Sequence, residues 1–439
     1  MVRSNQAEEL NTTIKENNLT IFNFLSERGK GIFFPKEGIL SQSAEAKGSK
    51  INATIGVAIE DDGTPMRLQS IEEKIRLNPN DVFLYAPSFG QFELREAWKR
   101  EIIKKNPSMR GNISLPVVTN GVTHGLHIVG YLFINPADEI ILPDKFWGNY
   151  KLIFENGFSG KLTTFNLFRE NRFDIVSFVE KLLENEGKKI VLFNFPNNPT
   201  GYSPTNKEAE KIVDAIKEYA DKGNKICIIC DDAYFGLFYK QNTFQESLFS
   251  LLADLDENIL AIKVDGATKE YYVWGLRVGF VTYASKGITE EGCRALESKT
   301  AGVVRGGISN VSNLSQNLVL EALRSPKFES EKKEKYELLK SRFEKVEEVL
   351  NDKKISEGSL PISHLPYNSG YFMCLELPSE EHAEKVRQIL LNKYQIGVIA
   401  VKNLLRIAYA SVAIKDIRQL FDSIYKAYEE TLKENYGKR

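Results

Sequence analysis

The segment KICIICDD, residues 225–232, is an apolar run of strand type that ends in two adjacent carboxylates. Comparable apolar runs lie before and after it along the chain. They are SLPVVT (114–119), DEIILP (138–143), KIVLFNFP (189–196) and ILAIKVD (259–265). We therefore expect a set of strands that begins near residue 110.

Longer amphipathic segments separate these runs. They are GVTHGLHIVGYLFI (121–134), WGNYKLIFENG (147–157) and NKEAEKIVDAIKEYADKG (206–223). The alternation of short apolar runs with helical patterns indicates a parallel sheet that is built from βα units. Ligands of such sheets bind beyond the carboxyl ends of the strands, so we expect functional residues directly after the apolar runs.

The length of 439 residues favours two domains, because one compact core rarely holds so long a chain. The pattern changes after residue 328, where a long charged helix is predicted over 329–353. Beyond it we expect the apolar segment 370–377, a helix over 380–392, strands over 397–401 and 404–410, and a terminal helix over 414–433. The expected units are an N-terminal arm with part of the small domain (1–65), a large domain (66–328) and a small C-terminal domain (329–439).

The charge balance favours small-molecule partners. The chain has 58 basic and 59 acidic residues, a formal net charge of −1, which gives no sign of a nucleic-acid footprint or a membrane-surface patch. Residues 1–18 lack the apolar core of a signal peptide, and no stretch approaches the length of a membrane span. We expect a cytoplasmic protein without nucleic-acid or membrane partners.

The cysteines and histidines form no pattern that indicates a metal or disulfide site. Four cysteines are too few for a disulfide framework in a chain of this length. Cys227 and Cys230 make a CxxC, but residues three apart on a strand point to opposite faces, which favours buried core thiols. The four histidines include no HExxH motif, so we expect no metal.

Three clusters of polar residues follow predicted strands. They are NFPNNPTGYSP (194–204), DDAYFGLFY (231–239) and GATKEYYVWGLRVGF (266–280). Each cluster alone has an ordinary explanation: a turn that starts a helix, a surface acidic pair, or a solvated basic residue. Their common position at strand ends favours one shared site instead.

Together these clusters resemble the class I and II aminotransferases of pyridoxal-phosphate (PLP) fold type I, in particular the aspartate and aromatic aminotransferases. The resemblance runs over nearly the whole chain. It implies an α/β fold in which a large domain has a mostly parallel sheet flanked by helices and a smaller α/β domain follows at the C-terminal end. It also implies a homodimer and the cofactor pyridoxal 5'-phosphate.

The resemblance assigns the central cofactor contacts residue by residue. In the family a lysine forms a Schiff base with PLP, an aspartate pairs with the pyridine nitrogen and an arginine holds the phosphate. Lys269, Asp231 and Arg277 match these positions in order and spacing. PLP acts as an electron sink only with a protonated ring nitrogen, which a carboxylate stabilises. The pattern D-x-A-Y gives this role to Asp231 rather than Asp232.

The lysine has two tasks that follow from its chemistry. It must be nucleophilic to bind the cofactor, and then basic enough to move a proton at the substrate α-carbon. A position near the end of an apolar strand can desolvate Lys269 and so tune it for both tasks.

Further cofactor contacts follow from the resemblance. The ring hydroxyl would be held by Tyr234 and Asn198. Trp147 matches the aromatic residue that stacks on the pyridine ring, although an ordinary core tryptophan is the alternative. Tyr85, in YAPSFGQFELREAW, matches a tyrosine that reaches the phosphate of the neighbouring subunit.

The phosphate itself needs backbone N–H donors at a helix start together with a fixed cation. In TNGVTHGLHIVG (119–130), Gly121, Val122 and Thr123 can supply these donors. The family often has a serine three residues before the lysine, but this chain has Gly266, which leaves Thr268 as the hydroxyl donor.

Substrate carboxylates call for arginine, because its planar fork binds them with two hydrogen bonds. The resemblance assigns the α-carboxylate to Arg406, with Gly56 letting the backbone close over it. Arg305 matches an arginine that crosses to the partner subunit and binds a side-chain carboxylate, with interface stabilisation as the alternative. A histidine that commonly supports the aspartate is replaced by Tyr150.

The expected function is therefore the transfer of an amino group between an L-amino acid, either aspartate/glutamate or aromatic, and a 2-oxo acid. A PLP-dependent β-lyase or a cyclopropane-forming synthase would use the same residues and remains the alternative enzyme. A non-catalytic PLP-binding regulator is disfavoured, because residues 1–65 lack a helix-turn-helix pattern and a basic face.

Overall fold

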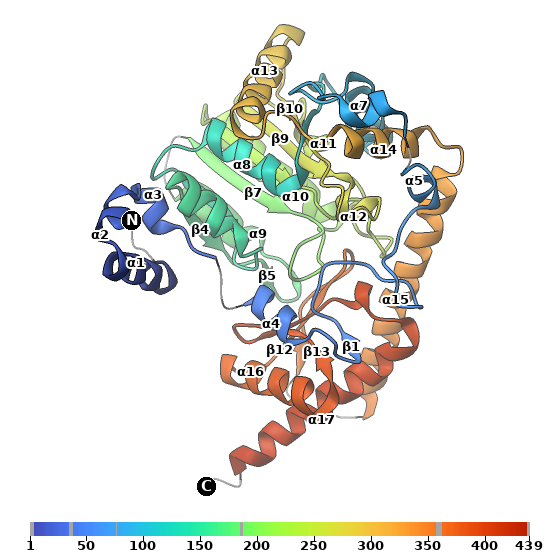
Figure 1. Ribbon diagram of the computed structural model, residues 1–439. Helices are drawn as coiled ribbons and strands as arrows, with labels where there is room; N and C mark the ends of the chain where they lie inside the picture. Colours follow the sequence, from blue (N-terminus) through green and yellow to red (C-terminus); the bar gives the residue numbers. More distant parts are fainter. Residues whose placement is uncertain (1–3, 35–37, 76, 185–187, 357–361, 437–439) are drawn as a thin grey trace.

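The structure, a computed structural model, describes residues 4–34, 38–75, 77–184, 188–356 and 362–436. Figure 1 shows a central sheet between helices and, below it, a second group of strands and helices from the C-terminal part of the chain. The long helix α15 (Phe328–Ser356) runs along both parts. No helix in these ranges is long and apolar enough to cross a membrane.

The central sheet has seven strands in the order β2-β10-β9-β8-β7-β3-β4. Their bounds are β2 (Val117–Thr119), β10 (Gly279–Ala284), β9 (Ile259–Gly266), β8 (Ile226–Asp231), β7 (Lys189–Asn194), β3 (Glu139–Pro143) and β4 (Lys161–Phe165). Strand β10 is antiparallel to both of its neighbours, whereas the pairings from β9 to β4 are parallel. The predicted mostly parallel α/β sheet is confirmed.

Helices cover both faces of this sheet, which explains why its strands read as continuous apolar runs. In β7, Ile190 and Leu192 pack in one core with Leu126 of α8 (Gly121–Phe133). The alternate residues Val191 and Phe193 pack in the other core with helices α9 (Ile175–Leu183) and α10 (Asn206–Asp221). The segment 147–157, predicted as a helix, is helical from residue 149 onward, and its central turns, η1 (Lys151–Asn156), form a π-helix.

Further elements flank the sheet. They are α5 (Gln69–Glu72), α6 (Pro79–Phe83), α7 (Phe92–Lys105), α11 (Leu248–Leu252), α12 (Ala267–Glu270), α13 (Glu290–Gly307), α14 (Asn313–Arg324), and the hairpin of β5 (Phe168–Arg169) with β6 (Arg172–Phe173). Trp98 of α7 stacks on Phe280 of β10 with ring centroids 4.1 Å apart, so this helix is fixed directly on the sheet.

A second sheet is antiparallel, with the order β11-β12-β15-β14. Its strands are β11 (Ser363–His364), β12 (Met373–Glu376), β15 (Leu404–Ile407) and β14 (Ile399–Val401), and its helices are α16 (Glu380–Ile389) and α17 (Ile417–Tyr436). The chain returns to this region from the N-terminal side, because β1 (Ile51–Asn52) pairs in parallel with β13 (Ile396–Gly397). The predicted strand 397–401 is thus divided between β13 and β14, and helix α16 continues as a π-helical turn, η2 (Leu390–Tyr394).

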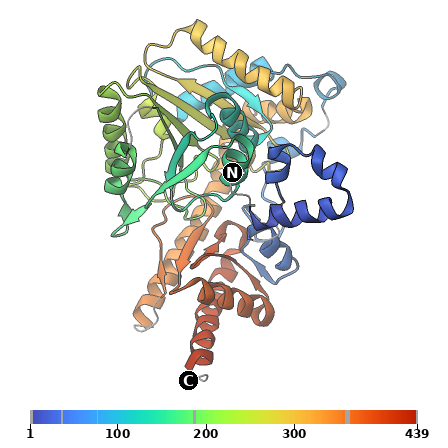
Figure 2. The same ribbon diagram turned by 90° about the vertical axis from the view of Figure 1, so that its left-hand side faces the viewer.

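The N-terminal helices α1 (Asn5–Asn17), α2 (Leu19–Phe24) and α3 (Glu27–Gly31) form a group at one edge of the molecule (Figure 2). A hydrogen bond of 2.9 Å from Asn156 Nδ2 to the Gly31 carbonyl ties this group to η1. The following helix α4 (Ile39–Glu45) lies beside the second sheet, where the Gln42 side chain donates to the Ala400 carbonyl at 3.0 Å.

Candidate active site

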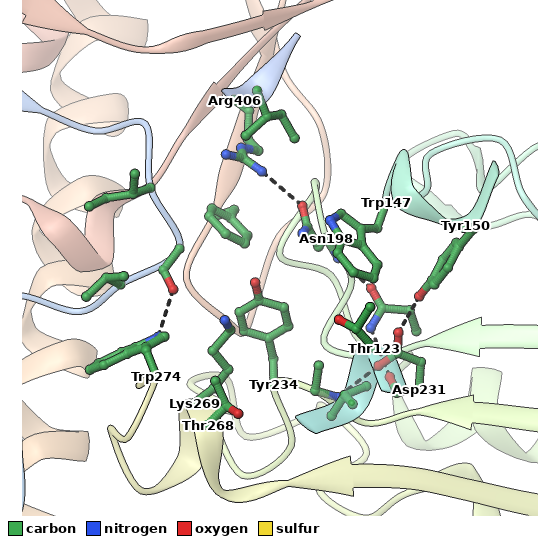
Figure 3. A pocket seen from close by; sticks show the side chains of 18 of the residues that line it. Thr123, Trp147, Tyr150, Asn198, Asp231, Tyr234, Thr268, Lys269, Trp274 and Arg406 are labelled. Atoms are coloured by element: carbon green, nitrogen blue, oxygen red, sulfur yellow. Dashed lines mark hydrogen bonds between the residues drawn. The ribbon is translucent and has the colours of Figure 1, made fainter. Parts of the chain in front are cut away.

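A cavity of about 390 Å³ lies between the carboxyl ends of the central strands and the second sheet. Figure 3 shows the side chains that surround it. The lining residues are Ile39, Ser43, Ile55, Gly56, Val57, Val122, Thr123, Trp147, Tyr150, Asn194, Asn198, Asp231, Ala233, Tyr234, Thr268, Lys269, Trp274, Arg277, Phe372 and Arg406. Most residues that the sequence predicted for the site are therefore neighbours around one space.

The register of the parallel strands explains this convergence. Asn194 at the end of β7 is paired with Asp231 at the end of β8, and Asp231 is paired with Val264 of β9. The three strands thus end nearly level. The polar clusters that follow them, with Asn198, Asp231 and Lys269, consequently meet at one edge of the sheet.

The turn after β7 is pressed against the second sheet. Gly201 has φ +72°, and a Cβ at this position would meet the Phe372 carbonyl oxygen at 1.9 Å. Only glycine fits so close to the other backbone. This contact closes the cavity on the side where Asn198 and Phe372 line it.

Asp231 is buried, with 2% of its surface exposed, and faces the cavity. The Tyr150 hydroxyl donates to its Oδ2, and the Ala233 amide donates to its Oδ1 at 3.1 Å. Burial raises the pKa of Asp231 to about 6, and the two hydrogen bonds oppose this rise. A carboxyl in this state becomes fully charged when a cationic group is brought beside it.

The neighbouring Asp232 points to the other face of the sheet, as successive strand residues do. Its Oδ2 accepts a hydrogen bond from Ser247 at 2.6 Å and another from the Lys263 ammonium. It does not line the cavity. Of the two acids, only Asp231 can contact a molecule bound there.

Lys269 lies in the short helix α12, directly after β9. Its ammonium is 5.4 Å from the centre of the Tyr234 ring. The pKa of Lys269 is lowered to about 8, first by desolvation and then by the positive charges of Arg277 and Arg406, against which Asp231 acts. A larger fraction of neutral amine is therefore available near neutral pH than for an exposed lysine.

Arg277 lies against the start of α8. Gly121, the first residue of this helix, has φ +77°, and a Cβ there would come within 2.4 Å of the Arg277 guanidinium. The structure forms no ion pair between Arg277 and a carboxylate of the described residues, and burial lowers the pKa of Arg277. Free N–H groups at the helix start and an unpaired guanidinium make this corner suitable for an anion.

Thr268 adds a hydroxyl to the cavity lining. Its Oγ1 is buried and has no hydrogen-bond partner among the described residues. An unsatisfied buried hydroxyl is costly, so a bound polar group is the simplest reason for it. A serine at position 266 would require adjustment, because a Cβ there would meet the Val278 carbonyl oxygen at 2.7 Å.

Arg406 is held at the other end of the cavity by β15. Its guanidinium donates to Asn198 Oδ1 at 3.2 Å and to the Thr54 carbonyl at 2.6 Å, and it lies 4.5 Å from the centre of the Phe372 ring. Arg406 is buried, and its Nε has no partner among the described residues. It makes no ion pair with a carboxylate there, so it can receive one from a bound molecule.

Gly56 and Tyr234 lie between Arg406 and Lys269. A Cβ on Gly56 would be 3.1 Å from the Phe372 ring and 3.3 Å from the Tyr234 hydroxyl, so glycine keeps this part of the cavity open. The Gly56 carbonyl accepts a hydrogen bond from Trp274 Nε1 at 2.9 Å. Burial raises the pKa of Tyr234 above its ordinary value, so this hydroxyl stays protonated and can donate.

Trp147 is half-buried and lines the cavity near Tyr150, with the two rings 5.6 Å apart in an edge-on arrangement (Figure 3). The indole also packs against a buried core cluster that includes Tyr150 and Phe154. It lines the cavity together with Asp231 and Asn198, and its stacking role stays a prediction.

Three predicted site residues do not line this cavity: Gly121, which lies against the Arg277 guanidinium, and the two residues Tyr85 and Arg305. Tyr85 follows α6 and is 90% exposed. Arg305, in the last turn of α13, is exposed and donates to the Ser309 hydroxyl at 2.8 Å. The single chain therefore does not bring either residue to the other predicted site residues.

The sequence reasoning missed the apolar side of the cavity. It is formed by Ile39, Ile55, Val57, Trp274 and Phe372, with Ser43 beside them. Trp274 could have been found, because it stands between Lys269 and Arg277 in the sequence. Gly56 was predicted from the family resemblance, but the other lining residues between 39 and 57 carry no motif that links them to the strand ends, so their place became visible only in the fold.

Comparison with known proteins gives consistent matches over most of the chain. The family model described as aminotransferase class I and II matches residues 50–424. A probable aspartate/prephenate aminotransferase of Aquifex aeolicus is 30% identical over 245 residues, which cover 55% of this chain and 57%, less than two thirds, of that protein. An aspartate aminotransferase of Pyrococcus horikoshii is 27% identical over 381 residues, covering 86% of this chain and 90% of that protein.

Among solved structures, an aminotransferase from Anaerococcus prevotii has a TM-score of 0.81 at 24% identity, covering 92% of this chain and 99% of that one. At this level of identity the likeness concerns the fold. The two-sheet arrangement around the cavity is thus shared with an aminotransferase.

Proposed function

The chain belongs to the class I and II aminotransferases and has their α/β architecture, PLP fold type I, and from this we propose that it moves an amino group between an L-amino acid and a 2-oxo acid with pyridoxal 5'-phosphate as cofactor. One observation carries the proposal. The amine of Lys269, the carboxylate of Asp231 and the guanidinium of Arg277 border the same cavity and come from three separate segments of the chain.

The residues of the cavity fit PLP in charge and in donor type. Arg277, the first amides of α8 at Gly121, Val122 and Thr123, and the unpartnered Thr268 hydroxyl suit its phosphate. Asp231 suits the ring nitrogen, Tyr234 and Asn198 the ring hydroxyl, and Trp147 the ring face. When bound, PLP would supply an electron sink for negative charge at the substrate α-carbon.

Each side chain then has a defined task. Lys269 holds the cofactor and afterwards takes a proton from the substrate α-carbon, which its lowered pKa of about 8 favours. Asp231 keeps a negative charge beside the ring nitrogen, and Tyr150 orients its carboxylate through the hydrogen bond to Oδ2.

Arg406 is the proposed partner of the substrate α-carboxylate. Its two bound N–H groups fix the plane of the guanidinium, and Gly56 leaves the space above it open. A carboxylate there would make charge-assisted hydrogen bonds, which are stronger than neutral ones.

For the substrate side chain we keep two classes, aspartate/glutamate and aromatic amino acids. The apolar wall of Ile39, Ile55, Val57 and Phe372 suits an aromatic ring. An acidic side chain needs a further cation, and Arg305 is our candidate if it reaches the cavity of a partner subunit.

We further propose a cytoplasmic homodimer. Large apolar side chains are exposed on α2 and around Tyr85, among them Phe24 at 85%, Phe83 at 83% and Leu84 at 61% exposed surface, as is usual where another subunit packs. The cysteines are free and buried, which suits a reducing compartment. We also propose the domain boundaries at residues 65 and 328. They are supported by the seven-stranded and the four-stranded sheet, whose strands respectively precede and follow α15 in the chain.

The test of the proposed function is a substrate panel. The purified protein is mixed with PLP, one amino acid and 2-oxoglutarate, and both the new 2-oxo acid and glutamate are measured. Equal amounts of the two products are expected. Release of ammonia without glutamate would instead indicate the β-lyase alternative, and no product from any amino acid would refute the proposal.

A further inference from the structure

A cluster of buried charges lies behind the candidate active site, on the opposite face of the central sheet. It consists of Asp232, Lys263 and Asp265, whose side chains are 5%, 1% and 4% exposed. The Lys263 ammonium contacts the Asp232 carboxylate and lies 3.5 Å from that of Asp265. It also lies 4.4 Å from the centre of the Phe235 ring. A lysine buried this completely in a strand needs partners of opposite charge.

The sheet geometry places this cluster directly behind Asp231. Lys263 of β9 is paired with Cys230 of β8, and Val264 is paired with Asp231. Because successive strand residues alternate between faces, Asp232, Lys263 and Asp265 share the face opposite to Asp231. The two adjacent acids, Asp231 and Asp232, therefore present one carboxylate to each side of the same sheet.

Two carboxylates this close in a buried environment disfavour each other's charge. The negative charge of Asp232 raises the pKa of Asp231. Lys263 compensates the charge of Asp232 through a direct contact. The pair Asp232 and Lys263 is thereby close to neutral when seen from Asp231.

We propose that Lys263 is a positioning residue for the cofactor: by neutralising Asp232 behind the sheet, it keeps Asp231 ionised in front of it. The inference rests on the proposed function, since an ionised Asp231 matters for a ligand with a cationic ring nitrogen. Lys263 does not line the cavity, so it would act on a bound cofactor only through Asp232 and then Asp231.

The other charges near this cluster balance one another. Glu270 accepts hydrogen bonds from Lys105 at 3.0 Å and from Lys332 at 2.9 Å, and Glu329 pairs with Lys104. Asp265 also accepts a hydrogen bond from Trp98 Nε1 at 3.0 Å; burial raises the pKa of Asp265, and the charges of Lys263 and Lys105 oppose this rise. On the cavity side, Asp231 faces Tyr150, Tyr234 and Lys269. Lys263 is thus the cation in direct contact with Asp232.

The experiment measures the dissociation constant of PLP against pH for four proteins. They are the wild type, Lys263→Met, Asp232→Asn and the double variant Asp232→Asn with Lys263→Met. PLP affinity should fall as pH drops through the pKa of Asp231, which gives each protein a midpoint. Lys263→Met should raise this midpoint. For each pKa unit by which the pKa of Asp231 then exceeds neutral pH, PLP binding at neutral pH should weaken about tenfold.

The opposite sign is expected for the other single variant. Asp232→Asn removes the negative charge and keeps Lys263, so the midpoint should move to lower pH. The double variant removes both charges and should return the midpoint and the affinity to within about twofold of the wild type, as expected for two coupled groups. A packing defect would not shift the two single variants in opposite directions.

Arg95→Met is the matched control, because Arg95 is a buried cation paired with Glu297 at 2.9 Å, away from the cavity. Folded Arg95→Met should bind PLP with the same pH midpoint as the wild type. If Lys263→Met does not fold, the midpoint of Asp232→Asn alone decides. Unchanged midpoints in Asp232→Asn, or a double variant no better than Lys263→Met, would overturn this inference alone. A wild type that binds no PLP would overturn the proposed function as well.

Discussion

The hydroxyl of Tyr150 donates a hydrogen bond to the carboxylate of Asp231, and both side chains are buried at the edge of the cavity. A histidine, which could be charged, is the residue that the family resemblance leads one to expect at this position. Tyrosine supplies a neutral donor instead, and burial together with the nearby negative charge raises the pKa of Tyr150 well above its ordinary value. Tyr150 therefore stabilises the ionised form of Asp231 without itself titrating in the physiological range.

The first prediction concerns this hydrogen bond. Tyr150→Phe should raise the pKa of Asp231 further above its present value of about 6, because one of the interactions that oppose burial is lost. A hydrogen bond to a charged group contributes about 1.5–3 kcal/mol, so roughly tenfold weaker PLP binding is expected at neutral pH, with partial recovery at higher pH. Tyr283→Phe, which removes a buried hydroxyl bonded to Thr300, is the control. Identical pH profiles for wild type and Tyr150→Phe would contradict the assigned role.

The second prediction separates the two adjacent acids. Asp231→Asn should lower kcat by about 100-fold or more, because a neutral amide no longer holds negative charge where the cationic ring nitrogen needs it. Asp232→Asn should keep kcat within a few-fold at pH 8, since this side chain lies behind the sheet with Lys263 and Ser247. Steady-state kinetics on both variants at saturating PLP provide the measurement. Equal losses of kcat in the two variants would mean that Asp231 makes no contact with the cofactor that Asp232 lacks.

The third prediction tests the anion corner at the start of α8. Gly121→Ala should weaken PLP binding about tenfold or more, because the left-handed conformation costs about 1–2 kcal/mol for alanine and the new Cβ displaces the Arg277 guanidinium. Gly302→Ala, in helix α13 with open space around the Cβ, is the control and should leave binding unchanged. Fluorescence titration with PLP measures both variants. An unchanged PLP affinity in Gly121→Ala would show that PLP binding does not depend on the placement of Arg277 against Gly121.

The sequence predicted five of the seven strands of the central sheet, because each of these five is an uninterrupted apolar run. Strands β4 and β10 were not predicted, since β4 is largely polar and β10 directly follows the cluster that contains Arg277. The sequence also predicted which polar clusters belong together, because level parallel strands bring their following residues to one edge; Asn194, Asp231 and Val264 are in register. The apolar wall at Ile39 and Ile55 could not be predicted in this way. Those residues reach the cavity only through the pairing of β1 with β13, which joins chain segments far apart in sequence.

The helix predicted over 147–157 is a further instructive case. Trp147 precedes the helical segment, which begins at residue 149 and includes Tyr150, and both residues line the cavity. Tyr85 and Arg305 stay predictions for a different reason. Their assigned roles act across a subunit boundary, where Tyr85 adjoins the exposed apolar residues Phe83 and Leu84.

The fourth prediction distinguishes the two substrate arginines. Arg406→Gln should lower kcat/KM for aspartate and phenylalanine alike, by about 100-fold or more, because two charge-assisted hydrogen bonds to the common α-carboxylate are weakened. Arg305→Ala should lower kcat/KM for aspartate alone if Arg305 reaches the partner's cavity, since only that substrate has a side-chain carboxylate. A parallel loss for both substrates in Arg305→Ala, or no loss for either, would leave Arg305 as a structural residue.

The fifth prediction concerns the amine of Lys269, on which the proposed chemistry depends. Its pKa of about 8, against an ordinary value of 10.5, means that its neutral form becomes abundant at lower pH than that of an exposed lysine. The rate at which the PLP-free protein captures PLP covalently should therefore rise with pH, with a midpoint near pH 8. Arg277→Gln removes a repelling positive charge and should move this midpoint upward.

The most direct test is to mix the purified protein with an equimolar amount of PLP, fix the bound cofactor by borohydride reduction, and locate it by mass spectrometry of the peptides. We expect the modification on the peptide that contains Lys269, with none in Lys269→Ala and normal amounts in the surface control Lys217→Ala. Transamination should be lost in Lys269→Ala and kept in the control. Modification spread over surface lysines, or undiminished transamination by Lys269→Ala, would contradict the account.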